Sequence, residues 1–178
     1  MEAASARYGG REFALAFGGN EMPGYHTGPG AHVGYLIGGR HSHLDCAGYS
    51  LDQKVERPPE PEELVDRLVE EERWRCVLNS LVVCLFARGI YRPEVVSRAL
   101  SPLGLELGPD DLREVGRSTY AERMRLKLEM GFDPSSLRVP ERVLETPTPH
   151  GAISREYVER AISRFSALLR EEIAGEGG

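Results

Sequence analysis

The sequence predicts a mainly α-helical fold: a helical bundle preceded by an irregular segment rich in glycine and histidine. Two observations indicate this fold. From residue 62 onward, apolar residues recur at three- and four-residue intervals, which is the spacing of an amphipathic helix. Before that point glycine, histidine and aromatic residues are frequent, and the composition changes at the PPEP stretch from Pro58 to Pro61. We therefore expect an irregular segment over residues 1–57 and a helical domain over residues 58–178, together forming one compact unit.

Length, charge and cysteine content restrict the class of protein. The 178 residues suffice for one domain with an ordinary core, and no run of about 18 apolar residues could span a bilayer. The net charge of -6, with basic residues interspersed among acidic ones, argues against nucleic-acid binding. The N-terminus has no signal or transit pattern, and three cysteines without a CxxC pair do not predict a disulfide framework. We expect a cytoplasmic protein with no membrane and no nucleic-acid partner.

The first segment offers two short elements. The stretch from Arg11 to Phe17 predicts a short strand, and the glycines and prolines that follow it predict a loop. The stretch from Ala31 to Gly39 is apolar and predicts a short buried helix that ends at its paired glycines. Residues 40–53 are polar, and we expect them to be irregular.

The strongest helical pattern runs from Glu62 to Gly89 and closes with an arginine and a glycine, as helix C-termini often do. It predicts one long helix, or two with a break near Trp74. Its second half, CVLNSLVVCLFA, is apolar on nearly every side. We expect that half to be the buried central helix of the bundle.

Three further helices are predicted, beginning at Pro93, at Pro109 and at Ser154. Proline is favoured in the first turn of a helix, and acidic residues follow Pro109 as the helix dipole prefers. Between the last two helices, residues 132–151 contain four prolines, so we expect an extended, non-helical segment there. The end of the chain, Gly175 to Gly178, is expected to fray.

The stretch RHSHLD places His41, His43 and Asp45 at alternate positions in a glycine-flanked loop. Such a loop can direct imidazole rings into a cavity, where a third ligand would complete a metal site such as zinc. The alternative interpretation is that both histidines form ordinary hydrogen bonds at the surface. The spacing leaves both open, and an independent metal-dependent enzyme using these three residues is one hypothesis.

Cys76, Ser80 and Cys84 follow one another at four-residue intervals on the predicted core helix, with Asn79 and Val83 beside them. A thiolate at such a position can bind iron. Free cysteine is also among the most frequently buried residue types, so simple packing is the alternative. Motifs for dinucleotide binding, P-loops and serine-hydrolase elbows are absent from the sequence.

Three stretches, in this order, resemble the C-terminal half of aldehyde:ferredoxin oxidoreductases: EMPGYHTGPGAHVGYLIGGRHSHLDCAGYSLDQ, LNSLVVCLFARG and RVPERVLETPTPHG. The first is similar to the family's passage from an E-x-P-x-Y segment into a glycine-rich turn and a histidine that faces the metal–pterin pocket. The second is similar to its D-x-x-G-L-C element. The third, Val139 to Gly151, is similar to the proline-bearing segment before the last helix. The resemblance covers nearly the whole chain and implies the helical fold of the family's C-terminal domains.

The resemblance implies roles for four residues. His43 takes the position of the catalytic histidine at the metal–pterin pocket. Asn79 and Val83 take pterin-facing positions, and Cys84 takes the position of the last ligand of a 4Fe-4S cluster. The implied cofactors are that cluster and a tungsten- or molybdenum-bis-pterin, with the segment over residues 1–57 facing them. The implied activity is oxidation of aldehydes to carboxylic acids, with electrons passed to ferredoxin.

The chain also departs from the family pattern. Asn79 stands where the family often has aspartate, and Val82 and Val83 stand where glycine and leucine are usual. The C-x-x-C-x-x-x-C group that supplies the other cluster ligands, the N-terminal sheet domain and the catalytic glutamate are absent from the sequence. One thiolate does not hold a cubane, so we expect a chain that is inactive alone and shares both cofactors with a protein chain carrying the missing parts. The alternative is a non-catalytic helical interaction protein derived from this family.

Overall fold

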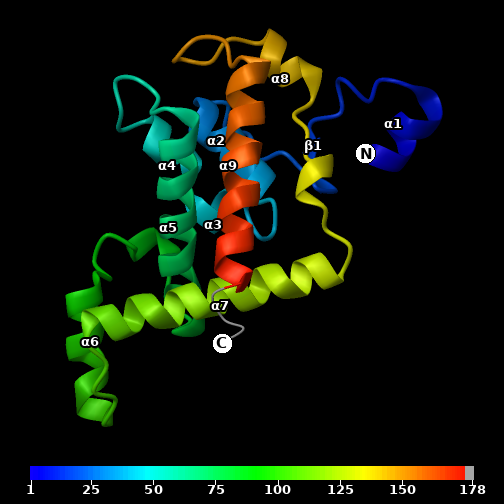
Figure 1. The fold of residues 1–178 in the computed structure, drawn as a ribbon. Helices are drawn as coiled ribbons and strands as arrows, with labels where there is room; N and C mark the ends of the chain where they lie inside the picture. The colour runs from blue at the N-terminus through cyan, green and yellow to red at the C-terminus, as the bar shows by residue number, and fades with distance from the viewer. Residues whose placement is uncertain (175–178) are drawn as a thin grey trace.

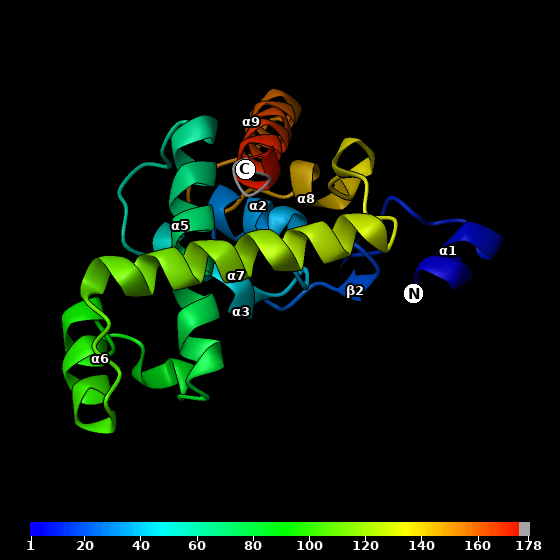
Figure 2. The same cartoon turned by 60° about the horizontal axis from the view of Figure 1, so that its bottom comes forward.

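Three long helices frame the molecule, as Figure 1 and Figure 2 show for the computed structural model, which describes residues 1–174. Helix α5 (Pro61–Ser80) and helix α9 (Arg155–Ala174) lie side by side, and helix α7 (Pro109–Glu129) crosses both. Helices α5 and α7 each begin with proline and acidic residues, which suit the positive end of a helix dipole. The prediction of a mainly helical fold is confirmed.

The first 57 residues hold more regular structure than expected. They form α1 (Glu2–Tyr8), an antiparallel pair of β1 (Ala16–Phe17) and β2 (Asn20–Glu21), α2 (Pro29–Ile37), α3 (His43–Cys46) and α4 (Gly48–Asp52). The predicted buried helix is confirmed as α2, in which all nine residues are buried. Only the last two residues of the predicted strand form β1. The expectation that residues 40–53 are irregular is wrong, because Ser42 and Asp45 form a capping box that starts α3.

The second half contains the predicted helices and, among the described residues, three short helical elements that the sequence pattern did not indicate: η2 (Ser101–Leu103), η3 (Pro134–Ser136) and α8 (Glu141–Glu145). Its other shorter elements are η1 (Leu85–Ala87) and α6 (Pro93–Leu100). The predicted helices from Pro93, Pro109 and Ser154 are confirmed as α6, α7 and α9. The expectation of a non-helical segment over residues 132–151 is wrong. Pro140 immediately precedes α8, where its fixed φ and missing amide do not disturb the helix.

Helix α5 ends earlier than the sequence predicts. We expected helical structure as far as residue 89, but α5 stops at Ser80 and the chain turns through Val82, whose φ of 56° is left-handed. The Val82 amide donates to the carbonyl of Asn79 (3.1 Å), and the Val83 amide donates to the carbonyl of Leu78 (3.3 Å). These two bonds form a Schellman motif, which usually has glycine at the left-handed position. Valine at that position concealed the end of the helix in the sequence.

The expectation that CVLNSLVVCLFA forms a buried central helix is correct for Cys76 to Leu78, which are buried in α5, and wrong for the exposed part after Ser80. Val82 is 90% exposed, Phe86 is 97% exposed and Ile90 is 64% exposed. The Schellman turn carries the chain away from the bundle, which leaves these apolar side chains without neighbours to cover them. We call residues 81–90 the exposed apolar segment.

The main apolar core takes side chains from both sides of residue 57, for example Phe17, Tyr35, Leu68, Met124 and Phe165. A smaller apolar cluster, centred on three other buried residues, joins α5, α6 and α7. The division at residue 57 and the single compact unit both stay predictions. Within residues 1–174, no helix combines the length and apolar composition that crossing a bilayer requires. The four C-terminal residues, for which we expect fraying, lie outside the described residues.

Candidate functional site

Three of the four residues with an implied role lie in one continuous stretch at the C-terminal end of α5. Asn79 is exposed in the last turn of the helix, and Val83 is half-buried just after the Schellman turn. Cys84 is exposed and immediately precedes η1. The structure therefore brings Asn79, Val83 and Cys84 together at the surface, at the beginning of the exposed apolar segment.

Cys84 was expected midway along a water-excluded helix, and that expectation is wrong. Its thiol is free and exposed, and the apolar side chains that flank it in sequence, Val82 and Phe86, are exposed as well. An exposed sulfur is accessible to a second polypeptide, whereas a sealed one is not. The role of Cys84 as a cluster ligand stays a prediction.

Val82 supports the similarity of this turn to the D-x-x-G-L-C element. The position at which that element has glycine is the position at which this chain has a left-handed φ of 56°. A β-branched residue in that region is a conformational outlier, and the left-handed conformation costs an L-residue roughly 1–2 kcal/mol. The backbone thus keeps the shape that glycine favours, although the side chain has changed.

Replacing Val82 with glycine is expected to stabilise the chain by about 1 kcal/mol, because relief of the left-handed strain exceeds the added entropy of unfolded glycine. Little packing is lost, since the Val82 side chain is 90% exposed. Urea unfolding monitored by circular dichroism measures the change. The control is Val83→Gly, at a half-buried position outside the left-handed region, which is expected to destabilise. A Val82→Gly protein no more stable than the parent would show that the turn is unstrained.

The fourth residue, His43, lies apart from this stretch, at the first position of α3. Its ring is half-buried against Tyr25 and Tyr49, with ring centroids 5.3 Å and 6.0 Å away. Burial, and then the nearby Arg75 guanidinium, lower the pKa of His43, which favours the neutral imidazole. Its Nδ1 atom is buried and has no hydrogen-bond partner in the described part of the chain. Arg75 Nη1 donates to the carbonyl of Leu44 (2.7 Å), which joins α3 to α5.

The alternating residues of RHSHLD face three different environments. His41 Nδ1 donates to the Tyr35 carbonyl (2.9 Å), so its Nε2 accepts from Lys127 Nζ (2.9 Å). Asp45 points inward and its side chain is fully buried, while His43 packs against tyrosine rings. Across residues 1–174, no group of three or more histidine, cysteine or acidic residues is arranged to hold a metal ion. The structure does not support a metal site built from these three residues.

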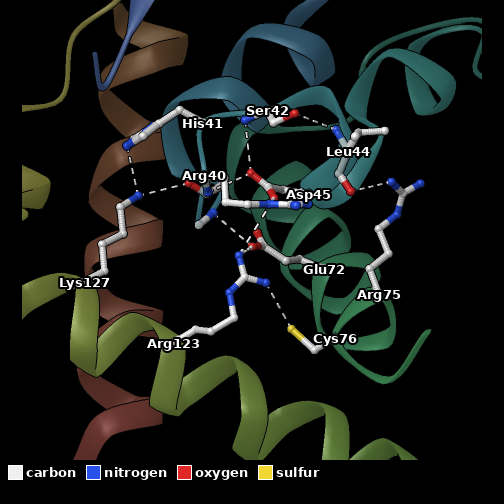
Figure 3. Close-up of polar contacts among 12 residues, drawn as sticks. Arg40, His41, Ser42, Leu44, Asp45, Glu72, Arg75, Cys76, Arg123 and Lys127 are labelled. Atoms are coloured by element: carbon white, nitrogen blue, oxygen red, sulfur yellow. Dashed lines mark hydrogen bonds and ion pairs between the residues drawn. The ribbon is translucent and has the colours of Figure 1, made fainter. Parts of the chain in front are cut away.

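Behind the loop lies a cluster of charged residues that the sequence analysis did not find (Figure 3). Arg40 Nε donates to Asp45 Oδ1 (2.8 Å), and Arg123 Nη2 lies 3.8 Å from the same oxygen and 3.2 Å from Glu72 Oε1. Arg123 Nη1 also donates to the sulfur of Cys76 (3.3 Å). We call these five residues the arginine–carboxylate cluster. It fastens the loop before α3 to α5 and α7, and thereby positions His43 relative to the end of α5.

One signal in the sequence could have revealed this cluster. Along α5 the apolar stripe of Val65, Leu68 and Val69 continues at helical spacing through Glu72 to Cys76. An acidic residue in an apolar stripe needs a buried cationic partner, and Arg123 of α7 is that partner. The sequence does not reveal which of the many arginines this is, because the contact spans 51 positions.

Burial dominates the electrostatics of this cluster. It raises the pKa of Glu72, and the Asp45 carboxylate raises it further, while Arg123 opposes the rise. Burial also raises the pKa of the Cys76 thiol, again against the influence of Arg123. A protonated thiol in this position is a packing group and not a metal ligand. Cys46, fully enclosed beside α2, has its pKa raised by burial in the same way.

Asn79 opens onto a cavity of about 510 Å³ that the arginine–carboxylate cluster also lines. Its walls are formed by Arg40, Cys76, Asn79, Ser80, Thr119 and Arg123. The amide, hydroxyl and guanidinium groups of this cavity are hydrogen-bond donors that suit the polar edge of a heterocycle such as a pterin. His43 does not line it. The structure therefore brings Asn79, but not His43, to this cavity.

The cysteines fit a shared iron–sulfur cluster and do not fit one held by this chain alone. A 4Fe-4S cluster requires four ligands, usually thiolates. Among the described residues Cys84 is the exposed thiol, while Cys46 and Cys76 are buried. This chain can thus offer one ligand at its surface, and a 4Fe-4S cluster at this place would need three further ligands.

The family model of aldehyde ferredoxin oxidoreductase, domains 2 and 3, matches residues 1–171. No curated protein and no solved structure matches the chain. The family match covers both segments that carry the residues with an implied role: the stretch with His43 and the turn with Cys84. With its helical fold, its left-handed turn at the family's glycine position and this match over nearly its full length, the chain belongs to the aldehyde ferredoxin oxidoreductase family, of which it represents the region of domains 2 and 3.

Proposed function

We propose that this chain is the C-terminal part of a tungsten- or molybdenum-pterin oxidoreductase that completes its cofactor site together with a partner chain. The observation that carries the proposal is the exposed thiol of Cys84, which lies directly after a Schellman turn at the position of the family's cluster cysteine. The match of residues 1–171 to the family's domains 2 and 3 supports it. We further propose oxidation of aldehydes to carboxylic acids, with ferredoxin as electron acceptor.

The need for a partner follows from the ligand count. Cys84 supplies one thiolate, and the other two thiols are enclosed by protein. A C-x-x-C-x-x-x-C group on the partner would supply the remaining three ligands. The exposed apolar segment, with Val82, Phe86 and Ile90 uncovered, is the kind of surface that an interacting chain covers. The partner therefore docks over the turn that carries Cys84.

Asn79, Val83 and His43 have different roles in the proposed site. Asn79 hydrogen-bonds the edge of the pterin through its amide, and Val83 packs beside it. His43, kept neutral by burial and by Arg75, can take up or release a proton as a hydrated aldehyde loses two electrons and two protons. Its Nδ1 is buried, so Nε2 is the atom that would exchange the proton. When bound, the metal–pterin group and the cluster supply the redox chemistry. The free thiols fit a reducing compartment, and we place the complex in the cytoplasm.

Replacing Cys84 with serine is expected to remove most of the iron from the assembled complex, whereas Cys76→Ser is expected to leave the iron content unchanged. Cys84 is exposed and can reach a cluster, while Cys76 is 2% exposed and bound by Arg123. The chain and its partner are co-expressed and purified together. Iron per folded complex, visible absorbance of the cluster, and tungsten and molybdenum contents are then measured.

Normalising iron to the folded fraction separates ligand loss from the packing defect that Cys76→Ser introduces. Equal loss of iron in both variants would contradict the assignment of Cys84. A parent complex that is colourless and free of metal would overturn the oxidoreductase proposal. That result would favour the second candidate, a non-catalytic interaction protein, for which the exposed apolar segment and Asn79 in place of aspartate are the supporting observations.

A further inference from the structure

The wall of one large cavity is strongly cationic, although the chain as a whole is acidic. The cavity, of about 1010 Å³, lies between the β1–β2 hairpin, the C-terminal end of α7 and the turn after α7. Among the described residues that line it, five cations face a single carboxylate, Asp133; the cations are Arg11, Arg40, Arg123, Lys127 and Arg138. In a chain of net charge -6, such a local excess of positive charge favours an anionic ligand.

Three of these cations form no ion pair within residues 1–174. Arg40 and Arg123 are held by the buried carboxylates of the arginine–carboxylate cluster, but Arg11, Lys127 and Arg138 are not paired with any carboxylate. The carboxylate of Asp133 is occupied by the backbone amide and hydroxyl of Ser135. Because Asp133 keeps its negative charge, the three unpaired cations leave an excess positive charge of about two in the cavity.

Lys127 is the most enclosed of the three. Its ammonium group donates to the carbonyl of Gly38 (3.0 Å) and to His41 Nε2 (2.9 Å), and lies 3.9 Å from the centre of the Phe132 ring. All of these neighbours are neutral. Burial lowers the pKa of Lys127 to about 8, while the Glu72 and Asp45 carboxylates behind it oppose the shift, so the ammonium is charged at neutral pH. Neither carboxylate is in direct contact with it, because both are held by arginines. An anion in the cavity would contact the ammonium directly.

The walls of the cavity are held in place. A Cβ atom at Gly18, whose φ is +52°, would lie 2.1 Å from the His41 ring, so the hairpin backbone rests directly on that ring. The side chain of Asn20 donates to the carbonyl of Arg40. Apolar side chains complete the wall beside Lys127, and Phe132 and Met130 are among them. The cavity wall thus consists of cationic groups and, beside Lys127, of apolar side chains.

We propose that this cavity binds a small organic phosphate, with the phosphate on Lys127, Arg138 and Arg11 and an apolar body against Phe132. Guanidinium groups bind phosphate oxygens through paired hydrogen bonds, and a doubly charged phosphate matches the unpaired cations better than a single carboxylate does. The cavity is large enough for a ligand of nucleotide size. None of His43, Asn79, Val83 and Cys84 lines it, although Arg40 and Arg123 line both this cavity and the one at Asn79. Of these two cavities, only this one is lined by the three cations assigned to the phosphate, so the proposal does not depend on the proposed cofactor site.

Titration of the full chain with phenyl phosphate, followed by amide chemical shifts and calorimetry at constant ionic strength, tests the proposal. We expect saturable binding with a Kd below about 1 mM, and affinity for inorganic phosphate about tenfold lower because it lacks the apolar body. Arg138→Gln, an exposed position, is expected to weaken binding of phenyl phosphate about fivefold, and Lys127→Met at least about tenfold. The matched control Arg98→Gln, at an exposed arginine of α6 outside the cavity, is expected to leave binding unchanged.

Three results would overturn the proposal. The first is no saturable binding of phenyl phosphate up to about 10 mM. The second is equal weakening by Arg138→Gln and Arg98→Gln, which would show only general electrostatic attraction. The third is equal affinity for phenyl phosphate and inorganic phosphate, which would show that the apolar part of the ligand does not contribute to binding. Because the experiment uses the isolated chain and reads no metal, its outcome is independent of the test of Cys84.

Discussion

Replacing Gly48 with alanine is expected to destabilise the chain by at least about 3 kcal/mol, because it forces two packed helices apart. A Cβ atom at Gly48 would lie 1.8 Å from the carbonyl oxygen of Gly30 and 2.4 Å from its carbonyl carbon. Both are backbone atoms of α2, which cannot rotate away as a side chain can. Helix α2 is buried along its whole length, so a shift there also disturbs the main core.

The same contact is reinforced by Asp52 at the end of α4. Its carboxylate accepts hydrogen bonds from the backbone amides of Gly30 and Ala31, both at 2.8 Å, and from the hydroxyl of Thr27 at 2.9 Å. These bonds satisfy amides at the start of α2 that have no partner within the helix. Separating α4 from α2 would therefore break buried charge-assisted hydrogen bonds in addition to packing contacts.

Urea unfolding of Gly48→Ala against the parent measures the effect, and Gly89→Ala is the matched control. A Cβ atom at Gly89 meets nothing within 4 Å, and the residue is exposed, so its replacement is expected to change stability by less than about 0.5 kcal/mol. If Gly48→Ala also costs less than about 1 kcal/mol, the backbones of α2 and α4 are not in close contact at Gly30 and Gly48.

Local signals in the sequence predicted most of the helices, but they missed the start of α8 and the end of α5. Proline followed by acidic residues marked the starts of α6 and α7, because these residues act on the first turn alone. The start of α8 after Pro140 was missed, since proline was taken only as a breaker of structure. The end of α5 was missed because Val82 occupies a conformation for which valine gives no signal. Both errors concern a residue whose effect depends on its position in the helix.

The candidate site likewise contains some residues that the sequence indicated and others that it did not. Asn79, Val83 and Cys84 are neighbours in the chain, so a motif could point to all three, although their exposure depended on where α5 ends. Arg123 and Lys127 were not found, because their partners lie on distant elements and a surface helix contains many basic residues. Only tertiary packing decides which of those cations becomes buried and which becomes solvated.

Acidification is expected to remove about 4–5 kcal/mol of stability through His32 as the pH falls from 6.5 to about 3. His32 is fully buried, and burial, followed by the neighbouring His26, lowers its pKa from 6.5 to about 3. Because the folded pKa lies below the unfolded one, the contribution is complete above pH 6.5. This stabilising contribution is lost at lower pH, because His32 becomes protonated in the unfolded chain but stays neutral in the folded chain.

The hydrogen bonds explain why His32 stays neutral in the folded chain. His26 Nε2 donates to the carbonyl of Thr146 (3.1 Å), so His26 Nδ1 accepts from His32 Nε2 (2.8 Å). A second proton on His32 would have to sit on Nδ1, which is buried and has no partner in the described chain. The rings of Phe17 and Tyr35 flank it and provide no acceptor for that proton.

The measurement is the free energy of unfolding in urea as a function of pH for the parent and for His32→Gln. Comparison with the variant is essential, because burial raises the pKa values of Asp52 and Glu72, and those groups gain stability as the pH falls. The difference between the two proteins isolates His32 and is expected to shrink by about 3 kcal/mol between pH 6.5 and about pH 4. If His32→Gln does not fold, the imidazole signals of the parent answer the same question: they should remain those of a neutral ring at about pH 4. A ring that titrates near its ordinary pKa would mean that a proton acceptor or water reaches Nδ1, and that the contact between α2 and the β1–β2 hairpin is looser than the buried His32 implies.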